Sequence, residues 1–126
     1  MVEEPIEFRA PSSEGARNPS ENTATLPVTR FDRSELNRIL TVYGRMVAAG
    51  EWRDYAVDFL EEVAVFSIFR RTSEIPLYRV EKRPKLRQRQ GQYCVIAAGG
   101  LVMKRGHELA QVLKVFDRKF IKALAD

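Results

Sequence analysis

The fold of this chain is decided by residues 52–98, which read WRDYAVDFLEEVAVFSIFRRTSEIPLYRVEKRPKLRQRQGQYCVIAA. This stretch consists of short runs rich in β-branched and aromatic side chains, separated by charged or proline-containing connectors. Such runs favour strands, because these side chains pack well on a pleated surface. We expect an antiparallel meander with strands at residues 55–59, 63–71, 77–82 and 93–98. The apolar residues of 52–60 also fit one helical face, so this first element is compatible with a strand or a helix.

Helices are expected on both sides of the meander. Asp32-Arg33-Ser34-Glu35 has the spacing of a capping box, so a helix should begin near Asp32, with Gly50 as its stop. Residues 101–103 are either a short strand or an extended loop, and apolar spacing predicts a last helix from about Gly106 to Leu124. The sequence therefore predicts an α+β fold, an antiparallel meander of three to five strands flanked by an N-terminal and a C-terminal helix.

Length and composition indicate one small domain with an arm in front of it. The chain has 126 residues, of which 44% are hydrophobic, enough for a core. Residues 1–30 hold four of the six prolines and show no apolar periodicity. We expect a disordered arm over residues 1–30 and a single α+β domain over residues 31–126.

Several classes of function are disfavoured. One Cys and one His build neither a disulfide framework nor a zinc site with four protein ligands. Cys94 and His107 are a conceivable nucleophile and base, but nothing in their spacing supports the pair. No cofactor motif is present, since Gly99-Gly100 lacks the rest of a phosphate loop. Because these catalytic and cofactor-binding groups are missing, we expect a protein that is not an enzyme. Because the sequence shows no signal peptide and no long apolar run, we expect it to be cytoplasmic and not bound to a membrane.

The net charge of +4 conceals a polarised chain. Residues 1–69 sum to −5 and residues 70–126 to +9, with +6 of the latter inside residues 70–89. In a strand over residues 77–82, Arg79 shares a face with Leu77 and Glu81, whereas Lys82 lies on the opposite face. Pro84 favours the end of this strand, and the residues up to Gly91 should form a mobile hairpin tip. Its Arg and Gln side chains can donate to phosphate oxygens and base edges.

A second cationic feature precedes the last helix. Lys104 and Arg105 oppose the positive end of the helix dipole unless an anion lies between them and the helix amides. Beyond them, His107, Lys114, Arg118 and Lys122 form a polar helix stripe, which is typical of a solvated face. The candidate anion-binding residues are Arg71, Lys82, Arg83, Lys85, Arg87, Arg89, Lys104, Arg105 and His107.

These residues favour a nucleic-acid-binding or regulatory module, with DNA or RNA as its partner. The alternative is an adaptor that binds an acidic protein, with the acidic arm shielding the basic surface as an autoinhibitor. An exposed sheet edge could also pair two copies of the chain into a homodimer.

The segments FSIFRR (66–71), PLYR (76–79), EKRPKL (81–86), GQY (91–93) and KRGHELAQVL (104–113) resemble a family of short bacterial proteins. That family is known only as a domain of unknown function, and the resemblance covers about residues 50–124. It implies a soluble bacterial protein and carries no functional residue over. The order of a helix, a meander and a second helix is also similar to the double-stranded-RNA-binding domain, whose second helix docks phosphates. The extra strand departs from that pattern, and the minor-groove loop motif is missing.

Overall fold

The protein is described from a computed structural model that places residues 27–71 and 75–125. Most of the expected N-terminal arm lies outside these residues. Thr29, which the sequence assigns to the arm, already contacts the domain, because its amide donates to the Leu60 carbonyl at 2.7 Å. Lys82 likewise donates to the carbonyl of Arg30 at 2.9 Å.

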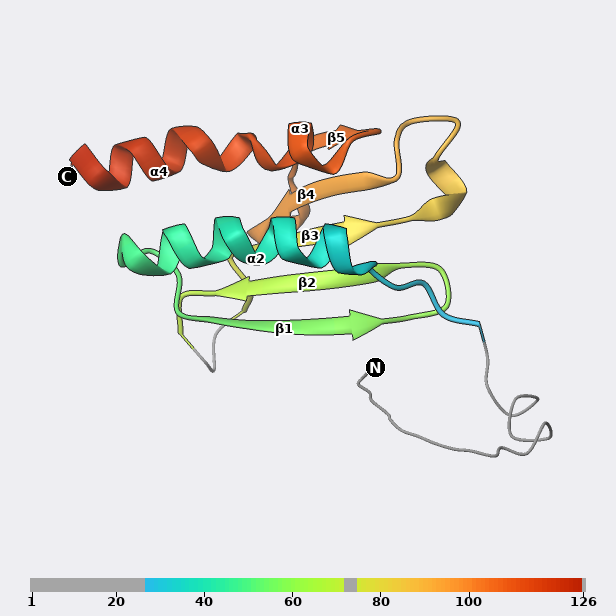
Figure 1. The fold of residues 1–126 in the computed structure, drawn as a ribbon, viewed down its shortest axis with the longest axis horizontal. Coiled ribbons are helices and arrows are strands. Elements are labelled where there is room, and N and C mark those ends of the chain that lie inside the picture. Colours follow the sequence, from blue (N-terminus) through green and yellow to red (C-terminus); the bar gives the residue numbers. More distant parts are fainter. Residues whose placement is uncertain (1–26, 72–74, 126) are drawn as a thin grey trace, which may run out of the picture.

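A two-layer α+β fold is observed, with one antiparallel sheet in the order β1-β2-β3-β4-β5 (Figure 1). The strands are β1 (Asp54–Phe59), β2 (Ala64–Phe69), β3 (Tyr78–Lys82), β4 (Tyr93–Ala97) and β5 (Val102–Gly106). Helix α2 (Arg33–Ala48) precedes the sheet, and α3 (Leu109–Leu113) and α4 (Val115–Ala125) follow it. Two short 3-10 turns, η2 (Pro84–Leu86) and η3 (Ala98–Gly100), connect the last three strands. The predicted α+β class is confirmed, and the meander, expected to have three to five strands, has five.

The expected start of the first helix is confirmed in detail. The Asp32 side chain accepts from the Glu35 amide at 2.8 Å, and the Asp32 amide donates to the Glu35 carboxylate at 2.7 Å. This is a complete capping box. Of the two structures compatible with residues 52–60, the strand is the one observed, as β1. The ring centroid of Tyr55 on β1 lies 5.0 Å from that of Tyr43 on α2.

The core fills the space between the sheet and the helices. Its largest fully buried side chains come from both layers, and they are Phe66, Ile68, Val80 and Val95 from the strands and Ile39, Met46, Val112 and Phe116 from the helices. Trp52 closes one end of this core, with its ring 4.9 Å from that of Phe116.

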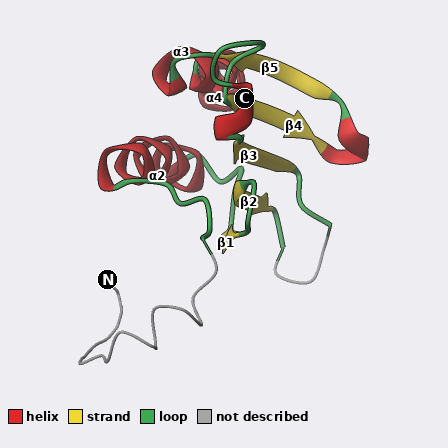
Figure 2. Cartoon of the chain, turned by 90° about the vertical axis from the view of Figure 1, so that its right-hand side faces the viewer, coloured by secondary structure: helices red, strands yellow, loops and turns green. Residues whose placement is uncertain are grey.

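All three helices lie on the same side of the sheet, as the edge-on view in Figure 2 shows. We call the other side the outer face; no helix of residues 27–71 and 75–125 covers it. Strand pairing places two rows of residues there. One row is Asp58, Val65, Glu81, Cys94 and Arg105, and the next is Ala56, Ser67, Arg79, Ile96 and Val102.

The prediction for residues 101–113 is wrong in one respect. Strand β5 runs through Lys104 and Arg105, because these residues pair with Val95 and Cys94 on β4. The last helical region begins only at Leu109 and is divided at Lys114 into α3 and α4. Lys104 and Arg105 therefore lie in a strand, and the argument for an anion held between them and a helix N-terminus does not apply.

The connection between β3 and β4 is a compact turn instead of the mobile tip expected from the sequence. Within it, the amides of Leu86 and Arg87 donate to carbonyls three residues earlier at 3.0 Å, and Gly91 donates to the Leu86 carbonyl at 2.9 Å. Gly91 has a φ of 106°, and a Cβ there would collide with the backbone of Gly106. Only glycine fits this position, so the turn is fastened to the end of β5.

Candidate anion-binding surface

Strand pairing brings most of the predicted cations to one end of the sheet. Strand β3 ends at Lys82, opposite the start of β4 at Tyr93, which in turn pairs with Gly106 at the end of β5. The Arg105 guanidinium reaches the Gly91 carbonyl in a long contact of 3.5 Å. We call this end the hairpin surface, and its cations are Arg83, Lys85, Arg87, Arg89 and Arg105.

Two of these five cations already hold a carboxylate. Arg83 Nε lies 3.1 Å from Glu81, and Lys85 Nζ lies 2.9 Å from Glu62. The hydrogen bond from Lys85 lowers the pKa of Glu62, and the same bond raises the pKa of Lys85. Arg87 and Arg89 are exposed, and neither forms an ion pair with another residue that the structure describes. The cations at the tip of the turn are thus the ones without an ion-pair partner among the described residues.

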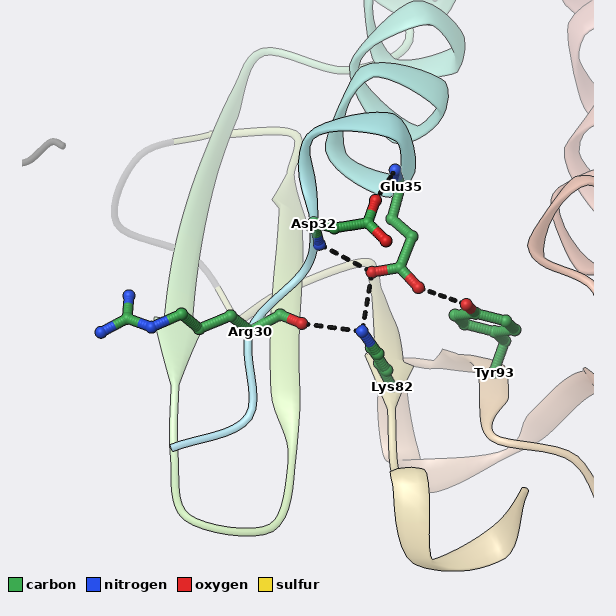
Figure 3. A network of polar contacts seen from close by, with 5 residues as sticks. All are labelled: Arg30, Asp32, Glu35, Lys82 and Tyr93. Carbon is green, nitrogen blue, oxygen red and sulfur yellow. Dashed lines mark hydrogen bonds and ion pairs between the residues drawn. The ribbon is translucent and has the colours of Figure 1, made fainter. Parts of the chain in front are cut away.

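Lys82 does not contribute to the hairpin surface. Its side chain is 16% exposed and points toward α2, where Nζ donates to Glu35 at 2.8 Å and to the Arg30 carbonyl at 2.9 Å (Figure 3). The other oxygen of Glu35 accepts a hydrogen bond from the Tyr93 hydroxyl. Burial, reinforced by this bond, raises the pKa of Tyr93 well above its ordinary value. The network anchors the first turn of α2 to the sheet.

The remaining predicted residues are dispersed. Arg71 follows β2 at the opposite end of the sheet, where β3 begins. Lys104 pairs with Val95 of the core, so it points to the helix side of β5, while Arg105 points to the outer face. His107 is exposed in the short link between β5 and α3. Arg71, Lys82 and Lys104 are therefore separated from the five cations of the hairpin surface.

The outer face carries a charge cluster that the sequence analysis did not select. Arg79 on β3 and Arg83 directly after the strand flank the buried Glu81, with Arg79 Nε 3.5 Å from its carboxylate. Beside them, burial raises the pKa of the Cys94 thiol, and the nearby Arg105 opposes part of that rise. A protonated, buried thiol is a poor nucleophile. The alternation of β3 had already put Arg79 and Glu81 on one face, and this was the signal for the cluster.

The helix layer adds basic residues that are not among the candidate anion-binding residues predicted from the sequence. Arg33 and Arg38 line a shallow hollow along α2. A groove of about 360 Å³ between α2 and the C-terminal helices is bordered by Arg38, Arg45 and Lys114. On this side Arg45 is paired with Asp117 at 3.7 Å. These residues occupy the polar face of an amphipathic helix, where periodicity alone does not separate a binding residue from a solvated one.

Two kinds of site are not found among residues 27–71 and 75–125. No group of three or more His, Cys, Asp or Glu side chains is placed to hold a metal ion. No helix in the same residues combines the length and apolar character needed to cross a bilayer.

Fold and surface together define a two-layer α+β domain that presents a hydrogen-bonded cationic turn at one end of its sheet. The model of the family "Protein of unknown function (DUF2794)" matches residues 29–113, more than half of the chain, and the chain belongs to this family. The match confirms the resemblance seen in the sequence, and it extends further upstream to include α2. No curated protein and no solved structure matches the chain.

Proposed function

We propose that the hairpin surface binds the phosphate backbone of a nucleic acid. The observation that carries this proposal is the convergence of Arg87 and Arg89 at the turn with Arg105 of β5, which reaches the Gly91 carbonyl. Guanidinium groups donate in a planar fork that matches phosphate oxygens. The turn is held by backbone hydrogen bonds, so its arginines lose less conformational freedom on binding than they would in an open loop.

Binding should be dominated by electrostatics and show little preference for base sequence. Arg83 and Lys85 are partly neutralised by Glu81 and Glu62, which leaves two to three effective phosphate contacts. The logarithm of the affinity should then fall with the logarithm of the salt concentration with a slope of about −2 to −3. A module with so few phosphate contacts binds nucleic acid only at low salt, or when a second site also contacts the nucleic acid.

The domain is proposed to bind without catalysis. Cys94 is buried and its pKa is raised, so the thiol stays protonated at neutral pH. Glu35 is joined by hydrogen bonds to Lys82 and Tyr93, and this network anchors α2. Neither arrangement offers an activated group to a substrate.

Fluorescence anisotropy with labelled duplex DNA and duplex RNA at low salt tests the proposal. The double variant Arg87→Gln/Arg89→Gln should weaken binding by about thirtyfold, because each of the two lost phosphate contacts removes roughly 1 kcal/mol. Arg118→Gln/Lys122→Gln removes the same charge from exposed positions on α4, at the far end of the molecule (Figure 1), and should change the affinity much less. Undetectable binding, or equal losses in the two variants, would refute the proposal.

An acidic protein segment is the second candidate ligand. Arg83 and Lys85 already pair with carboxylates, so the same surface suits Asp and Glu side chains. Partners that co-purify after nuclease treatment, and that Arg87→Gln/Arg89→Gln releases, would favour this adaptor role.

The acidic arm is proposed to compete for the hairpin surface, whether the ligand is a nucleic acid or an acidic protein. If the arm shields the surface, Glu3→Gln/Glu4→Gln/Glu7→Gln should raise the affinity for anions. Unchanged affinity would exclude shielding.

A further inference from the structure

The exposed side of α2 carries charge of one sign. The helix holds three arginines and one carboxylate, and that carboxylate, Glu35, is buried and neutralised by Lys82 at 2.8 Å. The three arginines, Arg33, Arg38 and Arg45, are all exposed. A solvated helix face normally interleaves positive and negative side chains. The exposed side of α2 is instead uniformly basic, which favours contact with an anionic partner.

The hollow along α2 and the groove beside α3 and α4 form one depression, which we call the α2 groove. Both parts are lined by Arg38 and Thr41, so they join at these two residues. The charged side chains that line the α2 groove sum to +3, and they are Arg33, Arg38, Arg45, Lys114 and Asp117. Its one carboxylate is paired with Arg45 at 3.7 Å. In the part of the chain that the structure describes, Arg33, Arg38 and Lys114 form no ion pair.

The α2 groove begins beside the hairpin surface. Arg33 and Ser34 lie in the first turn of α2, and Glu35 anchors that turn to Tyr93, the residue at which β4 starts. Burial raises the pKa of Tyr93, and Arg87 lies near enough for its charge to oppose part of that rise. The turn between β3 and β4 and the first turn of α2 thus lie at the same end of the molecule (Figure 1). One ligand can therefore contact the cations of both.

We propose that the α2 groove is a second contact surface for the nucleic acid bound at the hairpin surface, and that it holds the sugar-phosphate backbone. This inference rests on the proposed function and extends it. From Arg33 to Arg45 the helix rises about 18 Å, which spans about five phosphates of one duplex strand at about 3.4 Å of axis per phosphate. Between these arginines, the side chains of Ser34 and Asn37 can also donate to phosphate oxygens.

The second contact should appear in the salt dependence of binding. The hairpin surface alone accounts for a slope of about −2 to −3. Arg33, Arg38 and Lys114 add three cations without an ion pair in the described residues, so the two surfaces together should give a slope of about −5. The steeper slope indicates simultaneous contact, because the hairpin surface alone does not release that many counterions.

Fluorescence anisotropy of the full-length chain with a labelled duplex of about 20 base pairs, repeated over a salt series, tests the second contact. The groove variant Arg33→Gln/Arg38→Gln/Lys114→Gln should reduce the slope to about −2 to −3 and weaken binding at low salt by about 150-fold. The control variant Arg53→Gln/Arg118→Gln/Lys122→Gln removes the same charge from exposed positions that do not line the α2 groove. It should leave the slope near that of the unchanged chain.

Failure of this inference can be told apart from failure of the proposed function. If the unchanged chain does not bind, or Arg87→Gln/Arg89→Gln has no effect, the proposed function fails and the second contact with it. If Arg87→Gln/Arg89→Gln weakens binding but the groove variant keeps the slope of the unchanged chain, or loses no more affinity than the control variant, only the second contact is refuted.

Two further measurements complete the test. Polyglutamate is the probe for an acidic protein ligand: if the groove variant loses polyglutamate binding but keeps its affinity for the duplex, the α2 groove belongs to a protein partner and the inference is overturned. Circular dichroism shows whether each variant is folded. If the groove variant fails to fold, Arg38→Gln alone replaces it, because Arg38 lines both parts of the groove, and it should make the slope shallower by about 1. An unchanged slope in Arg38→Gln would then refute the second contact.

Discussion

Two glutamates with similar burial, one on each side of the sheet, have different structural roles. Glu35 belongs to the helix layer, and it binds the Asp32 amide at 2.7 Å, Lys82 at 2.8 Å and the Tyr93 hydroxyl. Glu81 lies on the outer face, and its ion-pair partners are half-exposed arginines two residues away in the sequence, Arg79 and Arg83, at 3.5 and 3.1 Å. The first carboxylate joins distant elements, whereas the second organises a surface. Burial of a charged residue therefore does not by itself show whether that residue holds the fold together or belongs to a surface cluster. The distinction comes from whether its partners lie on distant elements or next to it in the sequence.

The largest difference between the two sides should appear in the phenylalanines of β2. Phe66 is fully buried under the helices, and Phe69 is partly buried on the outer face of the same strand. Phe66→Ala should lower the free energy of unfolding by about 4 kcal/mol, because it leaves a cavity in the core. Phe69→Ala should cost about 1–2 kcal/mol. Urea unfolding measures both, and equal losses would mean that the outer face is as much a core as the helix side.

The two glutamates themselves provide the next test. Glu35→Ala removes the capping box and leaves Lys82 without its counterion, so it should cost about 3 kcal/mol. Glu81→Ala leaves Arg79 Nε buried, but the side chains of Arg79 and Arg83 are about 40% exposed. Water can therefore solvate most of their donors, and the loss should be about 1 kcal/mol, smaller than that for Glu35→Ala. Thermal unfolding at neutral pH distinguishes these values. A larger loss for Glu81→Ala would reverse the assignment of scaffold and surface.

A third prediction concerns alkaline pH. Because the pKa of Tyr93 is raised in the folded protein, the unfolded chain loses this proton first as the pH passes about 10. Stability should then fall by at most about 1.4 kcal/mol per pH unit, and Tyr93→Phe should remove this part of the decline. Tyr43→Phe is the control, because its pKa is raised less. An unchanged alkaline slope in Tyr93→Phe would show that the proton is not held more tightly on folding.

The smallest effect on stability, and the most useful for function, is expected from Glu62→Gln. The pair between Glu62 and Lys85 is fully solvated, so thermal unfolding should be unchanged. The freed Lys85 should instead raise nucleic-acid affinity severalfold in the anisotropy measurement. A change in stability without a change in nucleic-acid affinity would show that Glu62 stabilises the fold and does not modulate binding.

The sequence predicted most of the fold because local signals agree with it. The capping box at Asp32 and the alternation of β3 each specify one structure, and both were observed. The end of β5 was missed, because Lys104 and Arg105 show no apolar alternation and are held in the sheet by pairing with β4. The candidate site was predicted only in part for a similar reason. Whether Lys82 faces solvent or Glu35 depends on a residue 47 positions away, which no local pattern reveals.

The network around Glu35 also has a consequence for the order of folding. Each strand pairs with its neighbour in the sequence, so the meander can grow by closing short loops. Glu35 instead needs partners 47 and 58 residues further along the chain. During synthesis from the N-terminus, α2 can already pack on β1 and β2, because Tyr43 contacts Tyr55 and Phe66, but Glu35 has to wait until Lys82 and Tyr93 leave the ribosome. The anchoring of the first turn of α2 should thus be a late event, and its loss should mainly speed unfolding.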